Sequence, residues 1–146
     1  MQKHVLVGIG GLSGSVLVEL YTYLFGTWSE IMTTLLIFMA FDYLTGIAVA
    51  LKGNSSKSKS GKLNSKVGWQ GIVKKGITIL IVLMACRLDL TAHQFGIEAD
   101  VVNARNVVTG FFIGMEGISI LENAKKFGIK KMPAVLTNAL NKFIED

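Results

Sequence analysis

The chain has 146 residues, of which 51% are hydrophobic and only 17% are charged, and its formal net charge is +5. Soluble domains carry about 25% charged residues, so this composition argues against a soluble globular protein. The apolar residues gather in blocks instead of recurring at helical or strand period. We therefore expect one all-α integral membrane domain over residues 1–146, with three to four transmembrane helices and a C-terminal amphipathic helix.

The first apolar block covers residues 5–25 and predicts a helix that crosses the membrane or lies at its interface. A signal peptide has a similar profile, but no small-x-small cleavage site follows the apolar core. Small residues on this block let two helices approach closely in lipid. These candidate packing residues are Gly8, Gly11 and Ser15 on one face, and the GxxxG pair Gly10 and Gly14.

The second block, residues 31–51, follows a predicted turn at residues 26–30 in which Trp28 is placed like an interfacial anchor. It is long enough to span, since about 20 helical residues cross the hydrocarbon core. Asp42 lies near its middle, where an acid costs about 2.5 to 3.5 kcal/mol. Asp42 therefore needs water or a partner inside the membrane, either as a pore-lining group beside Thr45 or as a hydrogen-bonded group in a helix bundle.

A Ser/Gly/Lys segment at residues 52–70 predicts a flexible loop. A short and strongly basic loop stays in the cytoplasm, and its lysines can also contact anionic lipid headgroups. The candidate lipid-facing lysines are Lys52, Lys57, Lys59, Lys62 and Lys66, with Lys74 and Lys75 just beyond. No aromatic residues alternate with them, so nucleic acid is not an expected partner.

The third block covers residues 71–90, and its single cysteine, Cys86, is expected to act as a small hydrophobic residue. The fourth block covers residues 107–123. Gly110 and Gly114 form a GxxxG pair there, and Gly46 of the second block is a further candidate for helix packing. A polar stripe on the fourth block must face protein or water; its residues are Thr109, Glu116, Ser119 and Asn123.

Pro133 opens a short amphipathic helix over residues 133–146, which we expect on the inner leaflet or against the basic loop. The lysines after the fourth block favour four spans with both termini in the cytoplasm. Three spans, with the first block at the interface, is the alternative. No catalytic motif, cofactor-binding motif or metal-ligand pattern is present, so we expect neither an enzyme nor a cofactor.

Two segments carry a resemblance to a known family. They are FDYLTGIAVALKG (Phe41 to Gly53), followed by the basic loop, and MEGISILENAKKFGIKKMPAVLTNAL (Met115 to Leu140). Both resemble the phage lysis and toxin-secretion holins, which share a D-x-L-T-G segment and an E-G-x-S-I-L-E-N segment. Lys130, Lys131 and Met132 depart from the more apolar approach to Pro133 that the family pattern suggests.

The resemblance implies a homo-oligomer in the bacterial cytoplasmic membrane that forms a lesion and releases a cell-wall hydrolase (endolysin) or a toxin. In that mechanism, the intramembrane polar residues turn towards a water-filled lumen on assembly. The alternatives are a small ion or solute channel, an antiholin, or a membrane anchor that recruits a soluble partner through the basic loop.

Overall fold

The computed structural model describes residues 2–97 and 103–145, without the side chains of residues 2–13, 140 and 143–145. Five helices lie in these ranges: α1 (Gln2–Phe25), α2 (Glu30–Leu51), α3 (Ser65–Gln94), α4 (Ala104–Phe127) and α5 (Ala134–Glu145). The described residues contain no strand, so the all-α prediction is confirmed.

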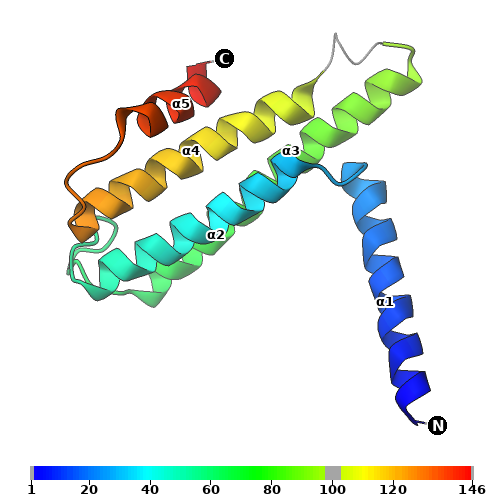
Figure 1. Ribbon diagram of the computed structural model, residues 1–146, viewed down its shortest axis with the longest axis horizontal. Helices are drawn as coiled ribbons and strands as arrows, with labels where there is room; N and C mark the ends of the chain where they lie inside the picture. Colours follow the sequence, from blue (N-terminus) through cyan, green and yellow to red (C-terminus); the bar gives the residue numbers. More distant parts are fainter. Residues whose placement is uncertain (1, 98–102, 146) are drawn as a thin grey trace.

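The helices α2, α3 and α4 form an elongated bundle, and α1 points away from it (Figure 1). The central helix is α4, which packs against α2, α3 and α5, whereas α2 and α3 touch each other little. Helices α2 and α4 run in the same direction, and α3, which lies between them in the sequence, runs in the opposite direction. The C-terminal ends of α2 and α4 therefore meet at one end of the bundle, together with the start of α3.

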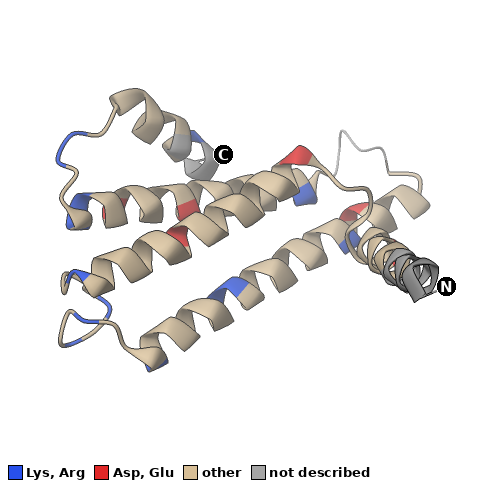
Figure 2. Ribbon diagram, turned by 60° about the horizontal axis from the view of Figure 1, so that its bottom comes forward, with Lys and Arg blue, Asp and Glu red and all other residues tan. Residues whose placement is uncertain are grey.

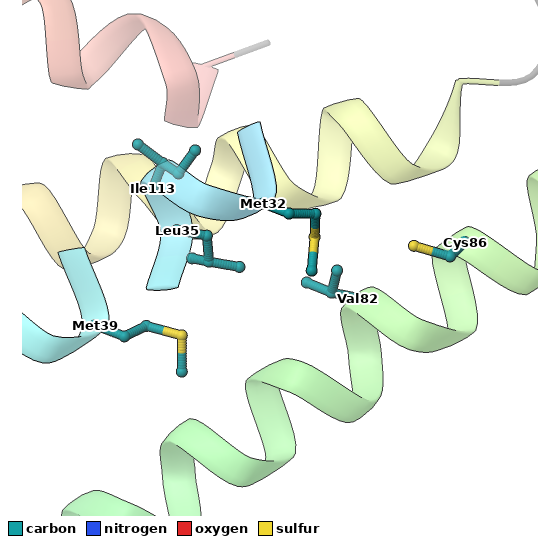
Figure 3. Close-up of a cluster of buried hydrophobic side chains, with 6 residues drawn as sticks. All are labelled: Met32, Leu35, Met39, Val82, Cys86 and Ile113. Carbon is teal, nitrogen blue, oxygen red and sulfur yellow. The ribbon is translucent and has the colours of Figure 1, made fainter. Parts of the chain in front are cut away.

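The apolar core lies where the three bundle helices converge, as Figure 3 shows. Its buried side chains are Met32, Leu35 and Met39 from α2, Val82 and Cys86 from α3, and Ile113 from α4. Cys86 is only 1% exposed and is a free thiol. The expectation that this cysteine packs as a small hydrophobic residue is confirmed.

The outer faces of the bundle are also apolar. Large hydrophobic side chains that are at least 45% exposed include Ile37, Phe41 and Leu44 on α2, Ile77, Leu80 and Met84 on α3, and Val107 and Met115 on α4. A soluble monomer rarely exposes contiguous apolar surface on this scale. The bundle therefore presents to its surroundings the kind of surface that a lipid bilayer solvates.

Two of the described helices, α2 and α4, are long and apolar enough to cross a membrane, and not the three to four that the sequence predicted. Only 28% of the most apolar stretch of α2 and 39% of that of α4 is buried, so neither is mostly buried as the core helix of a soluble protein would be. The difference concerns α1 and α3. In α3, a helix of 30 residues, the uninterrupted apolar run between Lys75 and Arg87 has eleven residues, so its hydropathy alone does not identify it as a span.

In α1, a helix of 24 residues, only the segment Gly14–Phe25 lies in the part of the chain whose side chains are described, and this segment alone does not test whether α1 spans. This helix ends at Phe25, and Gly26 adopts a left-handed backbone with φ of 78° before α2 begins at Glu30. The predicted turn between the first two blocks is thus confirmed. Trp28 in this turn is 57% exposed, and its indole Nε1 donates to Thr33 Oγ1 at 2.7 Å.

The basic loop is shorter and better anchored than expected. Helix α3 already begins at Ser65, and the Asn64 side chain caps it by accepting from the backbone N–H of Lys66 at 2.9 Å. Lys52 Nζ donates to the carbonyl of Phe127, and Asn54 donates to that of Lys126. These contacts fix the loop to the C-terminal end of α4, where exposed carbonyls attract cations. Figure 2 shows basic residues gathered at this end.

The short helix α5 lies along α4, with which it packs (Figure 1). We expected it on the membrane surface or against the basic loop. Its outward residue Val135 is 79% exposed and Leu136 is 44% exposed. The side chains of Leu140, Phe143 and Ile144, three further apolar residues of this helix, lie outside the described part of the chain.

Candidate functional site

An ionic cluster occupies the interior of the bundle, and each of the three bundle helices supplies one charge. Lys75 of α3 places its Nζ 3.0 Å from Oδ2 of Asp42 on α2 and 2.5 Å from Oε2 of Glu116 on α4. The three side chains are only 12–16% exposed. These are the two ion pairs among the described residues. One ammonium group thus pairs with two carboxylates that come from helices running in the same direction.

Asp42 also accepts hydrogen bonds from two polar side chains of α4. The Ser119 hydroxyl donates to Asp42 Oδ1 at 2.5 Å, and Asn123 Nδ2 donates to the same oxygen at 3.2 Å. The Asn123 amide also donates to Thr45 Oγ1 at 3.1 Å, and the Thr45 hydroxyl donates to its own helix at the carbonyl of Phe41. Asp42 is therefore the acceptor on which α2, α3 and α4 converge.

Gly46 lets α2 and α4 approach closely beside this cluster. A Cβ at this position would lie 3.7 Å from Asn123 Nδ2, the nearest neighbouring atom. This is ordinary contact distance, so the amide packs directly over the glycine. A longer side chain would push α4 away and break the hydrogen bonds from Asn123 to Asp42 and Thr45.

Ion pairing and hydrogen bonding offset the cost of burying the charges of this cluster. An isolated charge in a low-dielectric interior is very costly, and burial is tolerated when opposite charges pair and hydrogen bonds satisfy the remaining lone pairs. Two carboxylates and one ammonium group leave a formal charge of −1, and the hydroxyl and amide donors of Ser119 and Asn123 oppose it. The bundle therefore buries this polar cluster next to its apolar core, while its outer faces are apolar as well.

The structure brings together five of the six polar residues that the sequence singled out: Asp42, Thr45, Glu116, Ser119 and Asn123. The sixth, Thr109, lies two turns before Glu116. It is fully buried, and its hydroxyl has no hydrogen-bond partner among the described residues. Whether the six residues line a pore stays a prediction, because in the single chain the five clustered side chains bond with one another and with Lys75.

The small residues singled out for helix packing lie in different surroundings. Gly110 and Gly114 are buried in α4. No atom of the described residues lies within 4 Å of the place that a Cβ on Gly14 would occupy, and Ser15 is exposed. The remaining three, Gly8, Gly10 and Gly11, lie outside the part of the chain whose side-chain surroundings are described.

Lys75 is the cluster residue that sequence reasoning misplaced. We assigned it to the lipid-facing lysines, because the Lys74-Lys75 pair precedes an apolar block. Instead, α3 begins ten residues earlier at Ser65, so Lys75 lies within the helix and points into the bundle, while Lys74 stays exposed. The available signal was the acid near the middle of each of two apolar blocks, since buried acids require a cation.

Asp89 is a second residue whose position the sequence did not reveal. It lies near the end of α3, beyond the apolar run that ends at Cys86. Its two carboxylate oxygens accept from the backbone N–H groups of Ala104 and Arg105, each at 2.8 Å. Asp89 therefore caps the N-terminus of α4, whose first N–H groups lack partners within the helix. Arg87 donates to the carbonyl of Tyr23 at 2.9 Å and ties α1 to α3.

Two comparisons with known proteins relate this chain to bacteriophage holins. The model of the bacteriophage holin family matches residues 19–145, a longer range than the resemblance at residues 41–140. A probable holin of Bacillus phage phi105 is 32% identical over 119 residues, which are 82% of this chain and 77% of that protein. No solved structure matches the chain.

Bacterial proteins of uncharacterised function are also similar. One from Clostridium perfringens is 38% identical over 121 residues, 83% of this chain and 80% of that protein. One from Listeria monocytogenes is 30% identical over 138 residues, 94% of this chain and 83% of that protein. The family match covers α2 to α5, including every residue of the ionic cluster. The chain belongs to the bacteriophage holin family.

Proposed function

We propose that this chain is a pore-forming holin: it oligomerises in the bacterial cytoplasmic membrane and permeabilises it, so that an endolysin or a large toxin leaves the cytoplasm. The observation that carries this proposal is the ionic cluster of Asp42, Lys75 and Glu116 inside a bundle whose outer faces are apolar. Such a chain presents an apolar surface to lipid and keeps its charged side chains paired inside the bundle, from where assembly can expose them.

The direction of the helices supports a multi-pass topology. With 22 residues, α2 is roughly 33 Å long, close to the thickness of the hydrocarbon core. Because α2 and α4 run in the same direction, the chain between them has to return across the bilayer if both helices span. The returning helix is α3, and its charge at Lys75 is paired inside the bundle. The hydropathy of α3 alone does not reveal this crossing.

The basic loop and the lysines after α4 lie at the same end of the bundle, which we assign to the cytoplasm by the positive-inside rule. The C-terminus then lies in the cytoplasm. The N-terminus does so as well if α1 crosses the membrane as a fourth span. If α1 lies at the outer interface, three spans remain.

Assembly gives the cluster its function in this proposal. The little contact between α2 and α3 makes this the weakest seam of the bundle. Opening it in an oligomer turns Asp42, Glu116 and Ser119 towards a shared aqueous lumen, where the cost of burying them disappears. The exposed apolar faces then pack against neighbouring copies and lipid.

The decisive experiment is inducible expression in a bacterium together with a cytosolic cell-wall hydrolase that has no export signal. We expect abrupt loss of membrane potential followed by lysis, whereas the hydrolase alone leaves the culture growing. Depolarisation without lysis would identify a small ion or solute channel. Intact membranes, with delayed lysis when an independent holin is co-expressed, would identify an antiholin.

A further inference from the structure

A cavity of about 420 Å³ opens between α2, α3 and α4 near the basic end of the bundle. Its inner end is formed by the ionic cluster, and its other end by the basic loop, which contributes Lys57 and Lys62. This volume is within the usual range of small-molecule sites, about 300 to 1,000 Å³. The cavity runs from the middle of the bundle towards the proposed cytoplasmic surface.

Two glycines of α3, Gly68 and Gly71, line the cavity where α3 faces Tyr43 of α2. A Cβ at Gly68 would lie 3.7 Å from the hydroxyl oxygen of Tyr43, and one at Gly71 would lie 3.9 Å from its ring. Tyr43 is the nearest neighbour of both positions. Tyr43 therefore packs over these glycine positions and forms part of the cavity wall, and a larger side chain on α3 would meet the ring or extend into the cavity.

The walls and the mouth of the cavity differ in chemistry. The walls are mostly apolar and include Ile47, Ala50, Leu63, Val67 and Met115. The mouth carries the exposed side chains of Lys57 and Lys62, with Lys74 nearby. Both ion pairs in the described part of the chain use Lys75, so none of these three ammonium groups has a described carboxylate within 4.0 Å. An apolar slot with a cationic rim complements an amphiphile with an anionic head.

We propose that this cavity binds one anionic phospholipid, with the headgroup phosphate between Lys57 and Lys62 and an acyl chain along the apolar wall. The proposal rests on the proposed membrane topology, in which the basic end faces the inner leaflet and its anionic lipids. A lipid in this position lies in the seam between α2 and α3. It fills the space that direct helix contact leaves empty.

The test titrates the full chain, purified in a nonionic detergent, with dioleoyl phosphatidylglycerol or dioleoyl phosphatidylcholine and counts bound lipids by native mass spectrometry. We expect one phosphatidylglycerol per chain and much weaker binding of phosphatidylcholine. The double variant Lys57→Gln/Lys62→Gln is expected to bind about 30-fold more weakly, roughly fivefold for each lysine. Its matched control, Lys59→Gln/Lys66→Gln, removes the same charge from residues that do not line the cavity and keeps wild-type affinity.

A second pair of variants tests the apolar wall without changing charge. Gly71→Leu fills the cavity and is expected to reduce binding at least tenfold, whereas Gly76→Leu, on the same helix but facing open space, leaves it unchanged. Helical content by circular dichroism verifies that each variant is folded. Equal losses in both lysine pairs, or full binding by Gly71→Leu, would overturn the site. A chain that binds phosphatidylglycerol but releases no hydrolase in cells would overturn the holin role alone.

Discussion

Nζ of Lys75 lies 2.5 Å from Oε2 of Glu116, so an ion pair joins α3 to α4 inside the bundle. Lys75→Met removes the cation that serves both Glu116 and Asp42. We expect the free energy of unfolding in a detergent titration to fall by about 3 kcal/mol, because two buried carboxylates lose their partner. Lys74→Met is the matched control: its side chain is exposed, and we expect a change below about 0.5 kcal/mol. Equal effects of the two substitutions would show that the ion pairs contribute nothing.

The two acids are not equivalent. Asp42 accepts from Lys75, Ser119 and Asn123, whereas Glu116 accepts from Lys75 only, among the described side chains. We therefore expect Asp42→Asn to lower stability by about 3 kcal/mol and Glu116→Gln by about 1 kcal/mol. In cells, both substitutions are expected to change the time from induction to lysis, whereas Glu122→Gln, on an exposed part of α4, leaves it unchanged. A larger loss for Glu116→Gln than for Asp42→Asn would contradict the arrangement of hydrogen bonds described here.

The close approach of α2 and α4 depends on the small size of Gly46. Gly46→Ala adds a methyl group at ordinary contact distance from Asn123 and is expected to be tolerated. Gly46→Leu overfills the contact and is expected to destabilise the bundle by about 1 to 3 kcal/mol. Gly76→Leu adds the same side chain at a helical position with no described atom within 4 Å and serves as the control. Thermal unfolding in detergent measures all three variants.

Packing in the core is expected to matter more than apolar surface. Leu35 is fully buried between the bundle helices, whereas Leu44 on the same helix is 60% exposed. Leu35→Ala leaves a cavity and is expected to cost about 2 to 5 kcal/mol. Leu44→Ala removes a side chain that faces outward, and we expect less than about 1 kcal/mol. Denaturant titration of both variants in the same detergent gives the comparison, and similar costs would argue against the helix orientation found here.

The topology can be tested with single cysteines and a membrane-impermeant maleimide applied to intact cells. Ser60→Cys, in the basic loop, is expected to stay unlabelled until the cells are opened. His93→Cys, at the other end of α3, is expected to react at once. The native Cys86 is buried and gives little background. Labelling of both positions from the same side would mean that α3 does not cross the bilayer.

The sequence predicted much of this fold because its strongest signals are local. The block at residues 31–51 corresponds to α2 at Glu30–Leu51, and the block at residues 107–123 lies within α4 at Ala104–Phe127. Asp42 and Glu116 interrupt runs of apolar residues and could therefore be singled out as candidate intramembrane groups without any knowledge of their neighbours.

What the sequence did not reveal depends on contacts between distant segments. Lys75 follows Lys74 and precedes an apolar run, so hydropathy places both lysines at the membrane surface. Their roles are separated by the rotation of α3, which turns one ammonium group inward and the other outward. The capping of α4 by Asp89 likewise requires two residues that are fifteen positions apart to meet in space.

The docking of the basic loop on the end of α4 determines which parts of the molecule can move. Lys52 and Asn54 bind the last carbonyls of α4, and Asn123 joins the middle of α4 to α2. These two helices are thus joined at two levels, at the basic end and in the middle of α4. Helix α3 is held differently: Lys75 bonds to Asp42 and Glu116, and Asp89 caps the start of α4. If α3 separates from α2 and α4, the ammonium group leaves both acids in one motion. The same movement would therefore expose the acids to water and remove the ammonium group that pairs with them.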